Sequence, residues 1–342
     1  MGPDFALDDA QEAIVRLAGE VLSDDDGSPR RLWKSLGQAG LPGLAVPAEL
    51  GGAGLGAVAT GLLLTEIGRH AAPVPAWSTL SLGVLPVARF GSSRQQRELL
   101  PPVLEGRVLT AALGDPVTAT DDWRLTGTCR AVPDADQACR ILVPAGGEGA
   151  VALVDPAAPG VTLERTPTSA GTAEFALRLE DVAAEPLGDG PADIERFAVA
   201  GACALGDGAL AGALRMTAGH VRDRHQFGRP LATFQAVAQQ IADVYVASRT
   251  MHLAALAASW HQDQDHDSGT PAATDLWTAA YWLSSAALPA LRTCHHLHGG
   301  LGLDVAYPLH RHTALVRDLV RHLGGAEYCL DRLGGHGVHR PD

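Results

Sequence analysis

Two short phrases in the C-terminal part of the chain carry residue types that hold a phosphate-bearing ligand. The first is Arg224-His-Gln-Phe-Gly-Arg-Pro-Leu-Ala-Thr-Phe-Gln235, and the second is His298-Gly-Gly-Leu-Gly302. The planar guanidinium of Arg224 can donate two charge-assisted hydrogen bonds to a pyrophosphate. Gly299 and Gly300 carry no Cβ, so their backbone N–H groups can approach a nucleotide closely. Together the phrases predict a nucleotide site.

Both phrases are expected on helices, about seventy residues apart. Gln226, Phe234 and Gln235 then lie within about three helical turns of the arginine, where they can hold an adenosine by hydrogen bonding and packing. A purely structural alternative stays open. In that alternative Arg224 is an exposed helix cap, and the glycine pair only ends a helix.

Two other patterns indicate less. The run Gly51-Gly-Ala-Gly-Leu-Gly56 resembles a dinucleotide-binding loop, but it lacks the preceding buried strand and the later ribose-binding acid, so a turn is predicted. Histidines gather at positions 295, 296 and 298, and His310, His312 and His322 follow. Two histidines three residues apart can share a helical face, but no carboxylate or cysteine completes a ligand set. No metal site is therefore predicted.

Composition restricts the class of protein. Hydrophobic content of 46% with 19% charged residues is typical of a globular chain. The net charge of −13 argues against nucleic acid or an anionic membrane surface as a partner, because phosphate binding needs a basic face. Five scattered cysteines fit buried thiols in a reducing compartment. The N-terminus has no signal-peptide pattern and no segment has eighteen uninterrupted apolar residues, so a cytoplasmic protein without a membrane span is expected.

The texture of the sequence changes twice and predicts three domains. Residues 1–111 read as helices broken by Gly and Pro, residues 112–190 as short β-prone runs, and residues 191–342 as helices again. The β-prone runs begin at Trp123, Arg140, Ala150, Gly160 and Glu174 and predict a small antiparallel sheet domain. In the third region Phe234, Val237, Ile241 and Val244 form a stripe expected to face a helical core. The expected fold class is α+β, with an N-terminal helical domain, a middle β domain and a C-terminal helical bundle.

This order of elements and phrases resembles the acyl-CoA dehydrogenase family across essentially the whole chain. Trp33, Gly40-Leu-Pro-Gly-Leu-Ala-Val-Pro47 and Leu99-Leu-Pro-Pro-Val-Leu-Glu-Gly106 add to the resemblance. It implies an FAD cofactor, an acyl-CoA substrate and an electron-transfer flavoprotein as electron acceptor. It also implies that the cofactor-binding residues, which in the family reach the flavin of a neighbouring chain, are Arg224, Gln226, Phe227, Phe234, Gln235, His296, Leu297, Gly299 and Gly300. His296 takes the place of a family glutamine.

The catalytic base is altered at its usual place. In the family a carboxylate removes a proton from the carbon next to the thioester, most often a Glu in a Tyr-Glu-Gly-Thr phrase after the glycine pair. Counting without gaps from Gly299 puts Leu323 there, and leucine cannot accept a proton. A family variant places the base near the start of the helix before Arg-x-x-Phe-Gly. This offers Glu195, although counting back from Phe227 reaches Ala198. The plain alternative is that Glu195 is a first-turn acid favoured by the helix dipole.

The β region departs as well. Ala131 and Pro133 stand where the family has a Trp-x-Ser/Thr strand packed on the flavin ring, and proline also removes a backbone donor. Losing the ring side while keeping the groups that reach a neighbour resembles the shorter subunit of bacterial heteromeric acyl-CoA dehydrogenases, tetramers with two copies of each of two unlike chains. The activity implied is FAD-dependent α,β-dehydrogenation of an acyl-CoA in lipid or sterol side-chain catabolism. Two alternatives stay open: a self-sufficient homo-oligomer that uses Glu195, and a flavin-free scaffold.

Overall fold

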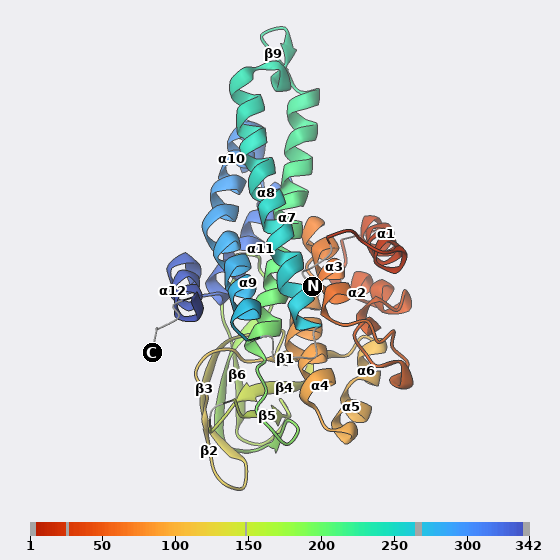
Figure 1. Cartoon of the computed structure of the whole chain (residues 1–342), viewed down its shortest axis with the longest axis vertical. Coiled ribbons are helices and arrows are strands. Elements are labelled where there is room, and N and C mark those ends of the chain that lie inside the picture. The colour runs from red at the N-terminus through yellow and green to blue at the C-terminus, as the bar shows by residue number, and fades with distance from the viewer. Residues whose placement is uncertain (1–4, 25–26, 148, 264–268, 338–342) are drawn as a thin grey trace. The chain divides into compact units, whose positions relative to one another are not determined.

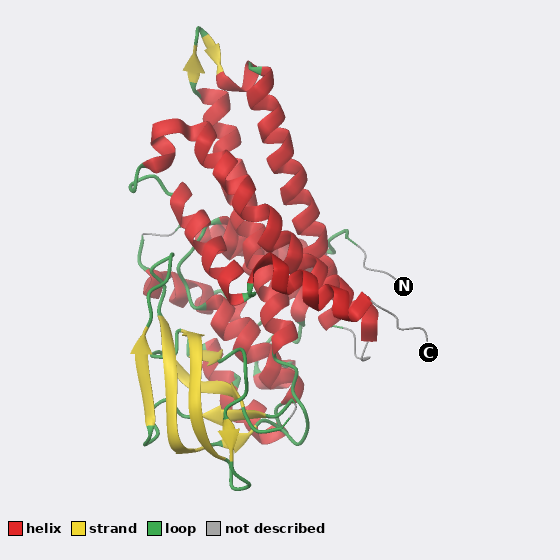
Figure 2. Cartoon of the chain, turned by 90° about the vertical axis from the view of Figure 1, so that its left-hand side faces the viewer, coloured by secondary structure: helices red, strands yellow, loops and turns green. Residues whose placement is uncertain are grey.

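The computed structural model describes residues 5–24, 27–147, 149–263 and 269–337 (Figure 1). The chain divides into two compact units, each assembled from separate stretches of sequence. The bundle unit comprises residues 1–15, 61–72 and 199–342, and the sheet unit comprises residues 16–60 and 73–198. Helices precede and follow a middle β region, so the predicted α+β fold class is confirmed (Figure 2).

The helices before the β region are short and are closed by Gly and Pro. They are α1 (Asp9–Ser23), α2 (Pro29–Gln38), η1 (Leu41–Gly43), η2 (Ala48–Leu50), α3 (Ala57–Arg69), η3 (Trp77–Val84), α4 (Leu85–Phe90), α5 (Ser93–Leu99) and α6 (Pro101–Leu104). Helix α5 starts with a capping box, in which Ser92 and Gln95 each accept a hydrogen bond from the other's backbone N–H. The indole N–H of Trp33 donates to the carbonyl of Gly106 at 3.0 Å and ties α2 to the chain just before the first strand.

The β region of the sheet unit forms two four-stranded sheets. Their strands are β1 (Val108–Ala111), β2 (Thr118–Ala119), β3 (Arg124–Pro133), β4 (Ala138–Pro144), β5 (Val151–Val154), β6 (Val161–Arg165), β7 (Glu174–Ala183) and β8 (Glu185–Pro186). The orders are β1-β4-β5-β8 and β2-β3-β7-β6. All five predicted β-prone runs correspond to strands. The ladders that join strands β2 to β8 are antiparallel, as predicted for this region. Strand β1 was not predicted, because residues 1–111 were expected to be helical, and it pairs with β4 in parallel.

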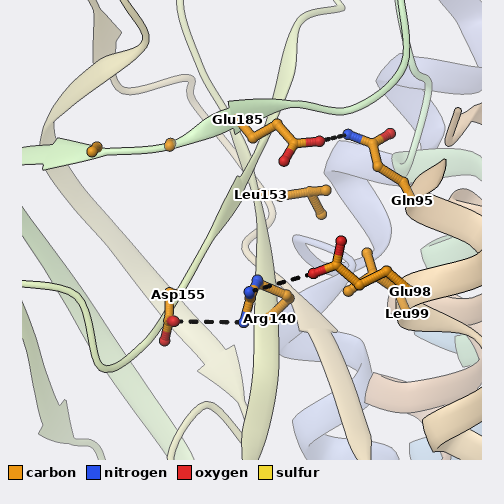
Figure 3. Close-up of a pocket in the computed structure, with 9 residues that line it drawn as sticks. Gln95, Glu98, Leu99, Arg140, Leu153, Asp155 and Glu185 are labelled. Atoms are coloured by element: carbon orange, nitrogen blue, oxygen red, sulfur yellow. Dashed lines mark hydrogen bonds and ion pairs between the residues drawn. The ribbon is translucent and has the colours of Figure 1, made fainter.

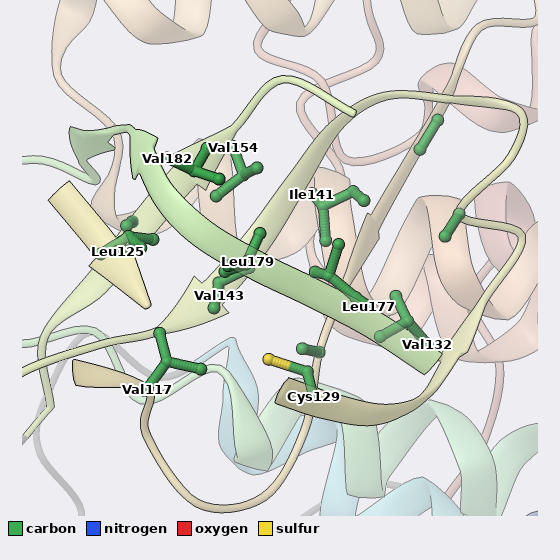
Figure 4. Close-up of a cluster of buried hydrophobic side chains, with 14 of the residues drawn as sticks. Val117, Leu125, Cys129, Val132, Ile141, Val143, Val154, Leu177, Leu179 and Val182 are labelled. Atoms are coloured by element: carbon green, nitrogen blue, oxygen red, sulfur yellow. The ribbon is translucent and has the colours of Figure 1, made fainter. Parts of the chain in front are cut away.

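Both sheets contribute to one hydrophobic core, shown in Figure 4. Leu125 and Cys129 on β3 are buried while Thr126 and Thr128 between them are exposed, which is the period-two alternation of a strand with one covered face. Ile141 on β4 is fully buried in the same cluster. Each fully buried side chain of this size stabilises the fold by about 1.5–3 kcal/mol relative to exposure.

The bundle unit is built on long helices. They are α7 (Glu195–Asp223, whose first turn belongs to the sheet unit), α8 (Gln235–Gln262), α9 (Gly269–Trp282), η5 (Leu283–Ala287), α10 (Leu288–His298), η6 (Gly299–Leu303), α11 (Leu309–His322) and α12 (Gly325–Gly337). The predicted stripe on α8 faces inward: Val244 is buried, and Phe234, Val237 and Ile241 are half-buried. The opposite face of α8 is exposed and includes Tyr245 and Val246.

Helices α3 and α7 approach so closely that their contact requires glycine. A Cβ built on Gly208 would lie 1.8 Å from the carbonyl oxygen of Thr65, and one on Gly68 would lie 2.0 Å from that of Leu205. The Thr65 hydroxyl also donates to the Ala204 carbonyl at 3.1 Å. The two helix backbones are therefore in direct contact along this stretch.

Helix α7 is long and apolar enough to cross a membrane by composition alone, but 89% of its most apolar window is buried within the fold. Its small residues explain both properties, because Ala and Gly are apolar and also allow neighbouring helices to pack close by. The burial is that of a core helix.

We predict that Gly208→Ala destabilises the protein while Gly219→Ala does not. An added Cβ at 208 must displace the α3 backbone, a form of overpacking that costs about 1–3 kcal/mol or more. Nothing lies within 4 Å of a Cβ at Gly219 on the same helix, so there alanine should be neutral or should stabilise by its helix propensity. Urea unfolding of both variants measures this, and equal midpoints would contradict the close-contact reading.

Candidate functional site

The Arg224 phrase forms a hairpin between α7 and α8 (Figure 1). Strands β9 (His225–Gln226) and β10 (Arg229–Pro230) pair across a two-residue turn, Phe227–Gly228, with φ of 52° and 78°. Positive φ at both turn residues is the type I′ geometry that suits tight hairpins. The expectation that this phrase is helical was therefore wrong for residues 224–230. Leu231–Thr233 form the 3-10 helix η4, and Gln235 is the first residue of α8.

The hairpin exposes the side chains that were predicted to bind a cofactor. Arg224, Gln226 and Gln235 are exposed, and Phe227 is 90% exposed although it is aromatic. Phe234 is instead engaged within the hairpin, since its ring contacts Phe227 edge-to-face at 6.1 Å and the Arg229 guanidinium lies 4.1 Å over it. Phe234 thus shapes the hairpin, while the arginine and the two glutamines are available to a ligand.

The glycine pair follows α10 and opens the 3-10 helix η6. Gly299 has φ 58° and ψ −133°, a conformation that only glycine adopts readily, so its identity is explained by the end of the helix. Gly300 has no such backbone requirement, and nothing lies within 4 Å of a Cβ built on it. This chain's own contacts therefore do not require glycine at 300. The open backbone fits a ligand or a partner that approaches closely.

The ends of the helices that precede the two phrases are in contact through two stacked histidine rings. The rings of His220 and His298 are 4.5 Å apart with an interplanar angle of 19°. His220 lies four residues before Arg224, whose N–H donates to the His220 carbonyl at 2.8 Å, and His298 directly precedes the glycine pair. The sequence did not single out His220, and no spacing rule links it to His298.

The other histidines of this region have separate roles. His296 is exposed beside the glycine pair, whereas the Leu297 side chain is buried, so only the backbone of Leu297 can reach a cofactor. His295 is held inside the fold by the Gly302 carbonyl and the Thr313 hydroxyl, both at 2.7 Å. Among the residues that the structure describes, no three His, Cys, Asp or Glu side chains gather as metal ligands.

The two candidate positions for a base differ in environment. Leu323, the residue that the gap-free count from Gly299 puts at the position of the family base, is the C-cap of α11 and is buried. Its side chain cannot be titrated. Glu195 is half-buried in the first turn of α7. Ala198, one turn later, is buried, and its carbonyl accepts the indole N–H of Trp77 at 3.0 Å. Of the two positions near the start of α7, only Glu195 carries a group that can accept a proton.

The stretch predicted to lack a flavin-ring wall lies at a strand irregularity. Ala131 has φ 56° where the β3–β7 register shifts between Cys129 and Val132. Pro133 ends the strand, and its carbonyl accepts the Thr110 hydroxyl at 2.7 Å. This end of β3 contains a bulge and a proline. Ala131 and Pro133, which stand where the family has Trp and Ser or Thr, carry neither an aromatic ring nor a hydroxyl.

Asp134, the next residue, is one that the sequence reading missed. Ser78 has one hydroxyl hydrogen but two acceptors in range, Asp134 Oδ2 at 2.6 Å and the Pro75 carbonyl at 3.0 Å. Both contacts are satisfied when Asp134 is protonated and donates to Ser78, which then donates to Pro75. Burial raises the pKa of Asp134, the Ser78 hydrogen bond lowers it and Asp136 raises it, and together they give a pKa of about 6.

A surface cavity of about 230 Å³ in the sheet unit is lined by charged groups that already have partners (Figure 3). Arg140 lies 3.8 Å from Glu98 and 3.6 Å from Asp155, and Glu185 is bound by Gln95 and Arg94. These ion pairs join α5 to β4, β5 and β8. The charged side chains that line the cavity are thus paired with protein groups, and they link neighbouring elements of the sheet unit.

The chain belongs to the acyl-CoA dehydrogenase family. Residues 6–107 match the model of the acyl-CoA dehydrogenase N-terminal domain, and residues 190–333 match that of the C-terminal domain. Members of this family are oxidoreductases that act on CH–CH bonds.

Individual relatives narrow the resemblance. The chain is 43% identical to acyl-CoA dehydrogenase FadE28 of Mycobacterium tuberculosis, over 97% of this chain and 98% of that protein. A variant of the steroid ACAD Tcur3481–Tcur3483 is 35% identical with a TM-score of 0.86, covering 96% of this chain and 97% of that one. The ChsE4–ChsE5 complex from Mycobacterium tuberculosis is 29% identical with a TM-score of 0.88, covering 99% and 100%.

We predict that Asp134→Asn changes how stability depends on pH. Because the folded pKa of about 6 lies above the ordinary value of 3.8, the fold favours the protonated acid. The stability associated with that proton is present below about pH 4 and is lost as the pH rises through 6. Asparagine removes this loss. The free energy of unfolding of the variant should therefore exceed that of the native protein by on the order of 2 kcal/mol at pH 7.5 and by less at pH 4.5.

Denaturant unfolding at both pH values measures the effect, with the exposed Asp115→Asn in the same unit as the control. A difference from the native protein that is the same at pH 4.5 and pH 7.5 would show that Asp134 is not held protonated.

Proposed function

We propose that this chain is one subunit of a heteromeric, FAD-dependent acyl-CoA dehydrogenase that forms a Cα–Cβ double bond in an acyl-CoA of lipid or sterol side-chain catabolism. The observation that carries the proposal is an asymmetry. The backbone at Gly300 and the side chain of Arg224 are open to a ligand, whereas the base position is a buried leucine, Leu323.

Within this proposal each exposed group has a role at one end of the cofactor. Arg224 would donate both prongs of its guanidinium to the pyrophosphate, and Gln226 and Gln235 would hydrogen-bond the adenosine end. The backbone N–H groups of Gly299 and Gly300 would donate to the same ligand where side chains are absent. When bound, FAD supplies the acceptor for the hydride that leaves the β-carbon of the acyl group.

The remaining functions fall to partners. Leu323 cannot take the α-proton, so in the proposed enzyme the unlike subunit supplies the carboxylate base and the ring-binding wall. An electron-transfer flavoprotein would accept the electrons. The five cysteines are all free thiols, which supports placing this assembly in the reducing cytoplasm.

Exposed apolar residues near both phrases support a subunit contact there. Phe227, Leu303 and Val305 are 90%, 83% and 86% exposed, and large apolar side chains this exposed are typical of interaction surfaces. Among the similar solved structures, Tcur3481–Tcur3483 is named as a steroid ACAD of two components, and ChsE4–ChsE5 is a complex. These names favour an unlike partner and a steroid-type acyl group.

A self-sufficient homo-oligomer is the second candidate, and the half-buried carboxylate of Glu195 in the first turn of α7 favours it. In that enzyme Glu195 would be the base. A flavin-free scaffold that keeps only the fold is the third.

Expression of the chain alone, and together with a genomically neighbouring dehydrogenase-like chain, separates these candidates. The heteromer predicts a visible flavin spectrum and dye reduction with an acyl-CoA only for the pair. A yellow, active chain alone would overturn the heteromer, and Glu195→Gln would then abolish turnover if Glu195 is the base. Absence of flavin from every combination would favour the scaffold.

We predict that Gly300→Ala lowers the flavin content of the purified pair without lowering the stability of this chain. The new Cβ meets no atom of this chain within 4 Å, but it would occupy the space that a closely approaching nucleotide needs. A loss of about tenfold in flavin affinity is expected, which corresponds to about 1.4 kcal/mol.

The flavin-to-protein absorbance ratio after dilution measures this affinity, and the thermal unfolding midpoint of the chain checks its fold. Gly219→Ala, also free of contacts within 4 Å, is the matched control. Unchanged flavin retention in Gly300→Ala would remove the argument from the open backbone.

A further inference from the structure

The stacked rings of His220 and His298 form the direct contact that joins the two cofactor phrases. His220 lies in the last turn of α7, and His298 is the last residue of α10. One ring is therefore attached to the backbone that starts the Arg224 hairpin, and the other to the backbone that starts the glycine turn.

We propose that His220 and His298 are positioning residues: their stack holds the Arg224 hairpin and the Gly299–Gly300 turn in register, and the clamp weakens when either ring gains a proton. The significance of this clamp for a cofactor rests on the proposed function. The clamp itself is a property of this chain alone.

Hydrogen bonds place a proton on Nδ1 of the His298 ring. The Cys294 carbonyl, 2.8 Å from Nδ1, can only accept, so Nδ1 must donate. In the neutral ring the Tyr307 hydroxyl, 3.0 Å from Nε2, donates to the free lone pair. The Tyr307 ring also lies 5.2 Å from the His298 ring at an interplanar angle of 48°, so the imidazole has a second aromatic neighbour besides His220.

Burial and the neighbouring positive charges oppose protonation of either ring. Burial lowers the pKa of His220 below its ordinary value and Arg224 lowers it further, while Asp223 raises it. Burial also lowers the pKa of His298, the Cys294 carbonyl raises it, and His220 and His295 lower it. Tyr307 is the remaining titratable neighbour, and burial raises its pKa, so it stays a neutral donor.

The direction of the pH effect follows. Both histidines have folded pKa values below the ordinary value of 6.5, so the neutral, stacked state is fully favoured above about pH 6.5. As the pH falls through the folded pKa values, one ring becomes charged beside the other and beside Arg224. Repulsion then separates the rings and frees the hairpin from the glycine turn.

Hydrogen–deuterium exchange of the chain without flavin, corrected for intrinsic exchange rates, tests the clamp in a pH series that descends from pH 7.5. Removing one ring by His220→Ala should speed exchange at pH 7.5 both in residues 224–231 and in residues 299–303, by roughly two- to tenfold, as expected for an aromatic pair. The native protein should lose protection in both segments as the pH falls through the folded pKa values of the pair. His220→Phe keeps a ring that cannot be protonated and leaves only His298 to gain a proton, so it should keep more protection than the native protein at the acidic end of the series.

His70→Phe is the control, because His70 directly follows α3 and its Nδ1 contacts the Glu66 carbonyl of that helix at 3.0 Å. If His220→Ala left residues 299–303 unchanged, or if His220→Phe lost as much protection at the acidic end of the series as the native protein does, the clamp would be overturned. Flavin retention by the pair is measured separately. Failure of the native pair to bind flavin, with the exchange pattern intact, would count against the proposed function and not against the clamp.

Discussion

The contact between α3 and α7 is the constraint on which the bundle unit depends. Glycines at 68, 208 and 212 let carbonyl oxygens of the opposite helix approach to where a Cβ would otherwise stand, 1.8 to 2.2 Å away. Such an approach leaves almost no freedom to slide or rotate, because any displacement along the groove brings backbone against a larger side chain. The 29-residue helix α7 is thereby fixed early in its length, while its far end makes a separate contact through the stacked rings of His220 and His298.

Other contacts then use α7 as a fixed reference. His312 on α11 binds the Arg69 carbonyl at the end of α3 at 3.2 Å, and His252 on α8 binds the buried carboxylate of Asp207 on α7 at 2.8 Å. These polar contacts are specific in direction, so they set the rotation of α8 and α11 where apolar packing alone would allow several. These contacts orient α7 and α8, the two helices that the hairpin joins.

Sequence reasoning succeeded where the signal was local and periodic. The β-prone runs form strands as predicted, because alternating apolar and polar residues between glycines indicate a strand without information from the rest of the chain. The helical expectation for the Arg224 phrase failed because it followed the apolar spacing of its neighbours and gave too little weight to Phe227-Gly228 and Pro230, which favour a tight turn and block a helix. Strand β1, which pairs with β4 in parallel, was missed as well, because a four-residue apolar run does not by itself distinguish a strand from a helix.

The contacts that sequence could not supply join residues far apart in the chain. Ser78 and Asp134 are separated by 56 residues, and neither stands in a recognisable motif. The same holds for His220 and His298, whose stacking depends on where the glycine contact places α7. The chemical type of a residue determines which interactions it can make. Its partner depends on how the helices are placed, and in the bundle unit that placement depends on glycines, which have no side chain, at the contact between α3 and α7.

In the proposed heteromeric enzyme, the same distinction would explain how a subunit loses its base and keeps a role at the cofactor. A base is one side chain, and a single substitution, such as the one proposed at Leu323, would remove it without disturbing the helix that carries it. The donors at Gly299 and Gly300 are backbone groups, and their position is set by the end of α10 and by the ring of His298 held by Cys294 and Tyr307. Removing them would require changing the fold of the bundle. A chain that pairs with a more complete partner can therefore lose its catalytic side chain first. The backbone N–H groups that it exposes to a neighbour persist for as long as the bundle folds.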